Sequence, residues 1–280
     1  MRTLLLTAVA GVALLSAAPA AAQEMAADDA PFSGVYIGAA GGYDVQPNDV
    51  GSTILFDRGQ NGSFGDVVST AAGANAFSPG FCNGRAVGAT PGGGCRNDKD
   101  GWAYYGRIGA DRQMGNIVVG IVAEFGKTEI NDSVSAFSTT PASYTMYRQV
   151  NWEGSARLRL GFAADRTLFY GTGGPSYARI DHNFFTTNTA NAFAQSGRRD
   201  QLGFTGGGGI EQMIGRNLSF GLEYMYHQYD DDRARVSVTR GTAAANNPFV
   251  LAPDTSGTDF RRSDPKFRWH SMRATVGFRF

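Results

Sequence analysis

Eight segments of this 280-residue sequence alternate apolar and polar residues, and the gaps between them follow a pattern of their own. The segments lie near residues 32–45, 101–112, 117–129, 148–162, 167–180, 200–212, 217–229 and 267–280. Long gaps lie at 46–100, 130–147, 181–199 and 230–266, and short ones at 113–116, 163–166 and 213–216. A period of two is typical of β-strands, and long loops that alternate with short turns are typical of membrane barrels. The pattern predicts an all-β fold, an eight-stranded antiparallel up-and-down transmembrane β-barrel with four long extracellular loops.

The fourth segment shows the two faces of a predicted strand most clearly. Leu158, Leu160 and Phe162 lie on one face, and Arg157 and Arg159 lie on the other. A barrel in water would show the same alternation with its polar face outward. Here the polar faces hold mainly Gly, Ser and Thr and almost no lysine, while Tyr, Trp and Phe gather near the segment ends, as a membrane interface requires. We therefore predict that the apolar faces contact lipid.

The amino-terminal residues predict export. Arg2 precedes an apolar run from Leu4 to Leu15, and small residues end at Ala20–Ala22, which is the order of a secretory signal peptide with an A-x-A cleavage site. The run is too short for a spanning helix, which needs roughly 20 apolar residues. We expect cleavage of residues 1–22, and residues 23–280 to form an outer-membrane β-barrel domain in the cell outer membrane of a Gram-negative bacterium.

The polar faces of the predicted strands carry ten charged residues. A formal net charge of zero argues against nucleic acid as a partner. The interior of an eight-stranded barrel is just wide enough for side chains to fill it, and buried charges are costly unless they are paired. We predict a charge network that plugs the lumen, formed by Arg107, Asp111, Glu124, Glu153, Arg157, Arg159, Glu211, Glu223, Arg273 and Arg279.

The first long loop, 46–100, contains both cysteines, Cys82 and Cys95. Two nearby cysteines in an exported chain predict a disulfide within the loop. A metal site would need more ligands than this stretch supplies, and His182, His227 and His270 lie in no metal-ligand spacing. We expect no metal and no cofactor, and we expect the three histidines to be polar residues near the extracellular rim.

Arginines gather where the predicted strands meet the extracellular loops. They are Arg148, Arg179, Arg198, Arg199, Arg233, Arg235, Arg261, Arg262 and Arg268. Lipopolysaccharide phosphates lie at this level, and arginine binds phosphate through two parallel hydrogen bonds. The alternative is pairing with nearby acids at 230–232, 259 and 264, and this is the interpretation we favour.

Three stretches carry a family resemblance: WEGSARLRLGFAADRTLFYGTGG (152–174), GGGGIEQMIGRNLSFGLEYMYHQYD (206–230) and the terminal HSMRATVGFRF. They resemble the alphaproteobacterial porin-family outer-membrane proteins, which include outer-membrane immunogenic proteins and are related to the OmpA/OmpX-type eight-stranded barrels. The resemblance implies outer-membrane lipid and lipopolysaccharide as surroundings. It also implies that Phe278 and Phe280 form the signal that the barrel-assembly machinery reads. The last strand must pair with the first, near Val35–Tyr43, because a closed barrel has no free edge.

The resemblance leaves three functions open. The first is a structural or adhesive surface role, with a host or environmental surface ligand bound by the loops, because loops carry specificity on a generic scaffold. The second is a small-solute channel through a gated lumen. The third is a lipid A-modifying enzyme, which in similar barrels has His and Ser two residues apart on one lipid-facing strand. Here His270 and Ser271 are adjacent and point to opposite faces, so we expect no enzymatic activity.

Overall fold

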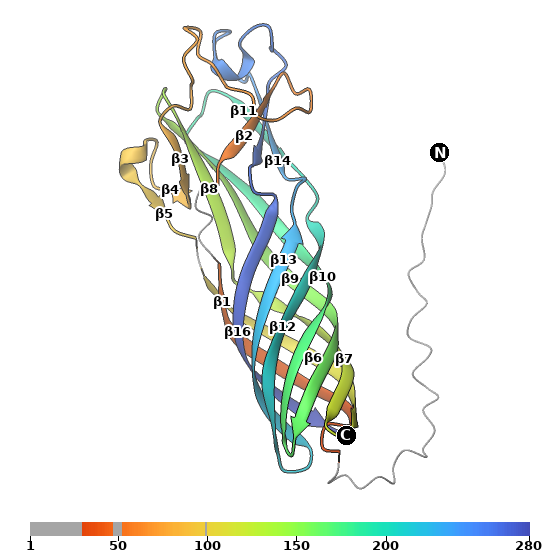
Figure 1. Ribbon diagram of the computed structural model, residues 1–280. Coiled ribbons are helices and arrows are strands. Elements are labelled where there is room, and N and C mark those ends of the chain that lie inside the picture. The colour runs from red at the N-terminus through yellow and green to blue at the C-terminus, as the bar shows by residue number, and fades with distance from the viewer. Residues whose placement is uncertain (1–29, 47–51, 99) are drawn as a thin grey trace, which may run out of the picture.

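The computed structural model describes residues 30–46, 52–98 and 100–280 and shows a closed eight-stranded barrel with a folded extension at one end (Figure 1). The predicted signal peptide, residues 1–22, lies outside the described residues. The barrel strands are β1 (Gly34–Val45), β6 (Gly101–Met114), β7 (Ile117–Thr128), β9 (Ala142–Ala164), β10 (Thr167–Thr186), β12 (Asp200–Ile214), β13 (Leu218–Asp230) and β16 (Lys266–Arg279). Each pairs antiparallel with its neighbours in the chain order, and β1 pairs with both β6 and β16. All eight predicted strands and the predicted closure of the ring are confirmed.

The closing pair sets β16 against β1 from Tyr36, opposite Arg279, to Val45, opposite His270. Side chains alternate across the barrel wall as the sequence predicts. Leu158, Leu160 and Phe278 are 70%, 62% and 46% exposed on the outer face. The carboxyl terminus lies at the end of the barrel opposite the extension (Figure 1).

Glycine makes room inside the barrel for large polar side chains. A Cβ at Gly109 would overlap the ring of Tyr36, and a Cβ at Gly120 would overlap the carboxylate of Asp111. An eight-stranded barrel has little interior space, so glycine in the wall opposite a tyrosine or an aspartate allows both to point inward.

A ring of aromatic side chains marks the outer membrane interface. Tyr43 contacts Trp102 with ring centroids 5.4 Å apart, and Trp152 contacts Phe125 at 5.5 Å and Tyr177 at 5.6 Å. These residues lie toward the extension ends of five neighbouring strands and face outward, as membrane-interface aromatics do. Segments beyond this ring therefore lie outside the membrane. The described residues include no helix with the length and apolar character that a membrane crossing requires.

Beyond the aromatic ring, the predicted loops form a β-sandwich, here called the extension. Strands β9 and β10 continue past the interface, and β8 (Asn131–Ser138) and β3 (Gly80–Asn83) join them to form one layer. The second layer has the order β11 (Ala192–Ser196), β14 (Arg235–Thr239), β15 (Thr258–Arg262) and β2 (Ile54–Arg58). Smaller elements complete it: β4 (Arg85–Ala86), η2 (Pro91–Gly93), β5 (Cys95–Arg96) and η3 (Pro248–Val250). The sequence predicted loops over these residues, and their folding into two layers is the main addition of the structure.

The two layers of the extension enclose an aromatic core. Phe56 stacks on Phe77 with ring centroids 4.3 Å apart and meets Phe260 edge-on at 5.0 Å, while Tyr144 lies 5.8 Å from Phe260. Each of these side chains is at most 5% exposed. Aromatic burial of this kind supplies most of the stability of a small sandwich.

Strand β9 runs from the barrel into the extension, and it contains one extra residue where the two meet. Val150 pairs with Ile180 and Trp152 pairs with Arg179, so Asn151 has no partner across the β9–β10 ladder and forms a bulge. Below the bulge the odd-numbered residues of β9 face inward, as Arg157 does, whereas above it the even-numbered Met146 faces the core. A one-residue insertion reverses the facing of everything that follows it. The bulge therefore lets the even-numbered residues of β9 face lipid in the barrel and face the core in the extension.

Candidate functional site

The middle of the lumen is crossed by an arginine–glutamate network. Glu124 accepts hydrogen bonds from Arg157 at 3.0 Å and Arg273 at 2.7 Å. Arg107 lies 3.5 Å from Glu124 and donates to Glu223 at 3.1 Å. The five side chains come from β6, β7, β9, β13 and β16, so their contacts run across the barrel as well as along its wall.

A second network lies toward the carboxyl-terminal end of the barrel. Arg159 donates to Asp111 at 2.8 Å and also to Glu211. Arg279 donates to Asp111 at 2.9 Å and to the Phe32 carbonyl at 2.8 Å. All four charged residues are at most 8% exposed, so their charges are matched within the lumen.

The third network lies toward the extension and contains residues that the sequence did not single out. Glu153 accepts hydrogen bonds from the hydroxyls of Tyr105 at 2.6 Å and Tyr229 at 2.7 Å, and it lies 3.2 Å from Nδ1 of His227. The His227 ring stacks on Trp269 with centroids 4.9 Å apart. His227 therefore points into the lumen at the extracellular end of the barrel, close to the rim where it was expected, but on the inner face. Its inward facing in β13 was the signal that could have placed it here.

The structure places all ten predicted lumen residues inside the barrel; nine are buried, and Arg107 is partly buried with a side chain that is 6% exposed. It adds tyrosines to them: Arg159 lies over the ring of Tyr170 at 3.9 Å, and Arg273 lies over Tyr105 at 4.6 Å. It also adds Asp44, which is fully buried opposite Ser271. Asp44 was missed because the glycines and alanines at 38–42 leave the two faces of its strand indistinct in the sequence.

Two of the predicted rim arginines lie inside the extension. Arg148 donates to Asp132 at 2.6 Å and lies 3.4 Å from Asp231, and Arg262 donates to Asp132 at 2.7 Å. Burial would raise the pKa of Asp132, but Arg262 and Arg148 outweigh burial and lower it to about 2. With exposures of 1% and 6%, Arg148 and Arg262 cannot contact lipopolysaccharide. Lipopolysaccharide contact is thus wrong for these two because the extension folds over them, and the favoured interpretation, pairing with acids, holds for Arg148 and Asp231.

The other predicted rim arginines lie at or near the surface. Arg198 and Arg199 are exposed in the connection before β12, and Arg199 lies 3.7 Å from Asp181. Arg179 is partly buried opposite Trp152 of the aromatic ring. Arg235 and Arg261 both stack on the ring of Phe64, at 5.0 Å and 4.3 Å. Arg268 and Arg233 lie near Asp264 and Asp232, at 3.4 Å and 3.9 Å.

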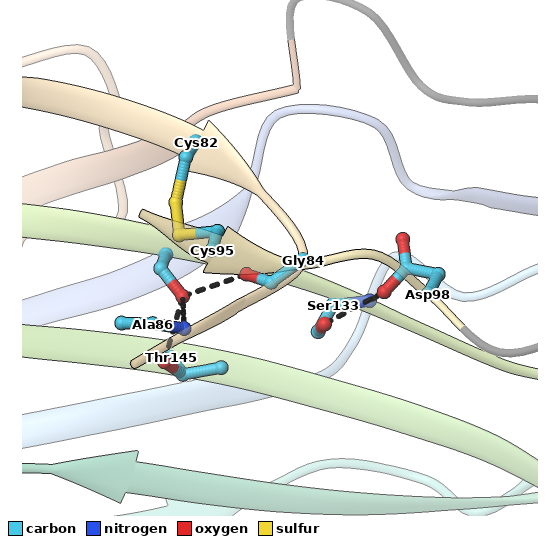
Figure 2. Close-up of a disulfide and its surroundings, with 8 residues drawn as sticks. Cys82, Gly84, Ala86, Cys95, Asp98, Ser133 and Thr145 are labelled. Carbon is cyan, nitrogen blue, oxygen red and sulfur yellow. Dashed lines mark hydrogen bonds between the residues drawn. A yellow bond between two sulfur atoms is a disulfide. The ribbon is translucent and has the colours of Figure 1, made fainter. Parts of the chain in front are cut away.

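Cys82 and Cys95 form a disulfide on the side of the extension (Figure 2). Beside it, Ser135 of β8 accepts a hydrogen bond from the Ala86 amide at 2.9 Å and donates to the Gly84 carbonyl at 2.8 Å. Asp98 accepts from the amide and hydroxyl of Ser133, both at 2.7 Å. The disulfide-linked segment is therefore attached to β8 at two points.

Asp98 is the titrating group of this attachment. Burial, together with the negative charge of Asp132, raises the pKa of Asp98 to about 7. The hydrogen bonds from Ser133 oppose this rise without cancelling it. Near neutral pH, Asp98 therefore changes charge while its neighbour Asp132 stays ionised.

The residues considered for catalysis or metal binding do not come together. His270 faces outward and contacts the Tyr224 hydroxyl at 2.6 Å, whereas Ser271 is fully buried on the inner face. His182 lies 2.8 Å from Asp231. Among the described residues, no three His, Cys, Asp or Glu side chains form a group that could hold a metal ion.

Cavities on the extension include the following two. One of about 230 Å³ is lined by residues 76–77, 138–142, 144, 187–190 and 247–249. The other, of about 100 Å³, is lined by charged residues that include Asp231, Asp232, Arg261 and Arg262. At the opposite end of the molecule, Phe278 and Phe280 are exposed on the outer face, with ring centroids 5.2 Å apart.

Curated proteins are similar in sequence to parts of this chain. The 31 kDa outer-membrane immunogenic protein of Brucella melitensis biotype 1 is 30% identical over 122 residues, which are 43% of this chain and 50% of that protein. The 22 kDa outer membrane protein of Rhizobium leguminosarum bv. viciae is 28% identical over 150 residues, 52% of this chain and 63% of that protein. The chain thus spans about half the length of the curated Brucella relatives it matches.

Two solved structures align with most of this chain. The outer membrane protein OprG from Pseudomonas aeruginosa has a TM-score of 0.46 at 14% identity, over 89% of this chain and 96% of that one. Ail, the attachment invasion locus protein of Yersinia pestis, has a TM-score of 0.33 at 9% identity, over 89% of this chain and 99% of that one.

A family match covers most of the chain. Residues 8–246 match the family described as outer membrane protein beta-barrel domain. This agrees with the closed ring of strands, its lipid-facing apolar wall and its aromatic ring. The chain belongs to the outer membrane protein β-barrel domain family and is an integral barrel protein of the outer membrane.

Proposed function

We propose that the protein is a closed, non-conducting barrel whose role is to hold a folded binding module outside the cell. One observation carries this proposal: the extension has its own aromatic core, while the lumen beneath it is crossed by three charge networks. An open pore would leave these charges in water, where such pairs contribute little. Their burial supports a plug.

Conductance through planar bilayers tests the plug. We expect the refolded protein to show no stable, discrete conductance. A variant with Glu124→Ala and Arg273→Ala removes the closest pair of the middle network, 2.7 Å apart, and should admit small ions. Discrete conductance of the unaltered protein, equal to that of the double variant, would establish a small-solute channel instead.

The proposal assigns no chemical reaction to the barrel. His270 and Ser271 face opposite sides of β16, so they cannot act as a pair on a lipid substrate. Lipid A from cells that lack the protein should have the same mass spectrum as lipid A from cells that contain it. A mass difference restored by the intact gene but not by His270→Ala would refute this part of the proposal.

We further propose that Arg198 and Arg199 contact lipopolysaccharide phosphates. They lie directly before Asp200, whose partner Arg179 is opposite Trp152 of the aromatic ring, so they stand at the headgroup level. Alanine at both positions should reduce co-purified lipopolysaccharide, whereas Arg233→Ala with Arg235→Ala serves as a matched control. Equal amounts from both double variants would exclude these contacts.

The exposed ends of Phe278 and Phe280 support a role in assembly. We propose that the assembly machinery reads them before the barrel closes. Deletion of Phe280 should slow insertion in cells but leave the urea midpoint of the refolded protein nearly unchanged. A lower midpoint with normal insertion would indicate a purely structural role.

A further inference from the structure

The larger cavity of the extension, here called the tip pocket, lies at its far end. It is bounded by the β8–β9 turn at 139–141, by residues 187–190 after β10, and by residues 247–249 at the start of η3, over a floor at 76–77. β8 runs outward from the membrane and β9 returns, so this turn is the farthest part of that hairpin (Figure 1). A ligand approaching the cell meets the tip pocket before it meets the barrel.

Three asparagines join the walls of the tip pocket. Asn188 donates to the Tyr144 hydroxyl and to Asn191, both at 3.0 Å. Asn191 donates in turn to Asn247 at 3.2 Å. These bonds connect the wall after β10 with β9 and with η3. The tip pocket is therefore formed before any ligand arrives, which lowers the entropic cost of binding.

The lining of the tip pocket is neutral. Within the described part of the chain, no Asp, Glu, Lys, Arg or His lines it. The smaller cavity, in contrast, is lined by four charged side chains. A neutral lining offers nothing to offset the desolvation of an ionised ligand. The absence of charge therefore selects against phosphate, sulfate and carboxylate groups.

The same lining is polar at the rim and apolar below. Thr139, Thr140 and Thr189 are exposed, and a threonine hydroxyl both donates and accepts hydrogen bonds. Phe77 and Phe249 lie beneath them, buried. At about 230 Å³ the cavity is below the roughly 300 Å³ at which sites for drug-sized ligands begin. The fitting ligand is small and uncharged, with hydroxyl groups on its edge and an apolar face.

We propose that the tip pocket binds one neutral sugar ring at the exposed end of a glycan. A pyranose presents hydroxyls around its edge and C–H groups on its faces, which matches threonines at the rim and aromatic carbons beneath. The inference rests on the proposed function of the extension as a binding module and names its ligand class. The glycan can belong to another surface or to lipopolysaccharide, and the ring chemistry is the same in both cases.

The test uses the full-length refolded protein in a detergent without a sugar headgroup. Methyl glycosides of glucose, galactose, mannose and N-acetylglucosamine are titrated and followed by saturation-transfer NMR. At least one should bind with a Kd on the order of 1 mM, as expected for a ligand with few atoms. Thr189→Tyr fills the tip pocket and should weaken binding by at least about tenfold. Thr255→Tyr, at an exposed position outside the pocket, is the matched control and should bind as the unaltered protein does.

Anionic sugars and lipopolysaccharide complete the experiment. The 6-phosphate or 6-sulfate of the best sugar should bind at least about tenfold more weakly than its neutral form. Competition by lipopolysaccharide with, but not without, its terminal sugars identifies the source as the cell's own glycan. Equal binding of the anionic form, no saturable binding, or full binding by Thr189→Tyr would overturn the inference. Conductance and protease resistance of the same preparations report on the closed barrel and folded extension, so the proposed function can fail or stand separately.

Discussion

The lumen and the extension solve the same packing problem with opposite chemistry. The lumen is filled by arginines, carboxylates and tyrosines, whereas the extension is filled by Phe56, Phe77, Phe260 and their neighbours. In the membrane, lipid already covers the apolar side chains, so the inside of the ring need not be apolar. In water the apolar side chains must be covered by the chain itself. The surrounding solvent, and not the strand geometry, decides which face of β9 is apolar.

Deletion of Asn151 should have the largest effect, because the bulge at this residue sets which side chains of β9 face the core of the extension. Without the bulge, Tyr144 and Met146 would turn out of the core and their polar neighbours would turn in. We expect the extension to lose its protease-resistant fold, a loss of more than about 5 kcal/mol, while the barrel keeps its heat-dependent shift in gel migration. Deletion of Ala245, in an exposed connection, is the control. A protease-resistant extension without Asn151 would contradict the role of the bulge.

Glu124→Leu tests the lumen side of the comparison. It leaves Arg157 and Arg273 without their closest carboxylate in a buried site. Breaking a buried pair on one side costs about 3–5 kcal/mol, so the urea unfolding midpoint of the barrel should fall clearly. Asp165→Asn, in the exposed turn between β9 and β10, should leave the midpoint unchanged. A midpoint equal to that of the control would mean that the network adds nothing to barrel stability.

Phe260→Ala tests the extension side. Its ring meets Phe56, Tyr144 and Phe249 within 6 Å. We expect the extension to lose about 3 kcal/mol, the lower end of the range for this change, because the connecting segments can close over part of the cavity. Proteolysis of the extension reports the loss, and the barrel's unfolding midpoint is the internal control. Equal loss in both parts would show that they unfold as one unit.

Removal of the disulfide should have a smaller and more local effect. Cys82→Ser with Cys95→Ser opens a closure whose ends are 13 residues apart, worth about 2–3 kcal/mol in chain entropy. Hydrogen exchange at residues 84–96 should rise, while exchange in β14 and β15 of the other layer should not. Faster exchange in both layers would show that the disulfide stabilises the whole extension and not only its own segment.

The smallest expected effect follows pH. The pKa of Asp98 is raised to about 7 from 3.8, so the folded state keeps a proton that the unfolded state loses between these values. The free energy that attaches this segment to β8 is therefore full below pH 3.8 and falls as the pH rises to about 7. Partial exposure of Asp98 weakens the effect. Exchange of the Ser133 amide should be faster at pH 8 than at pH 5 after correction for intrinsic rates, and Asp98→Asn should remove the difference. A difference that survives in Asp98→Asn would assign it to another group.

Much of the barrel could be predicted because lipid imposes a regular pattern on each strand. Leu158 and Leu160 alternate with Arg157 and Arg159, and this alternation alone places all four. The extension could not be predicted in the same way. Its second layer is built from strands of five residues, such as β14 and β15, and its core joins residues distant in sequence.

Arg148 shows the same limit for one side chain. Its acidic partners, Asp132 and Asp231, are brought to it by β8 and by the chain after β13, and nothing local in the sequence indicates that it is buried. The ten lumen residues were predictable because a strand's period places them. The burial of Arg148 and Arg262 was not, because a fold formed by the loops decides their surroundings.

The continuity of β9 has a mechanical consequence. This strand runs unbroken for 23 residues, and about ten of them, at roughly 3.3 Å each, extend beyond the aromatic ring. The tip pocket is thus carried on the order of 30 Å along the strand, on a stem formed by the continuous β9–β10 ladder. A pull on a bound glycan would load the ladder between β9 and β10 in shear, where many hydrogen bonds must fail together. Such a stem transmits tension to the membrane-embedded ring instead of dissipating it by swinging, and this suits attachment under flow.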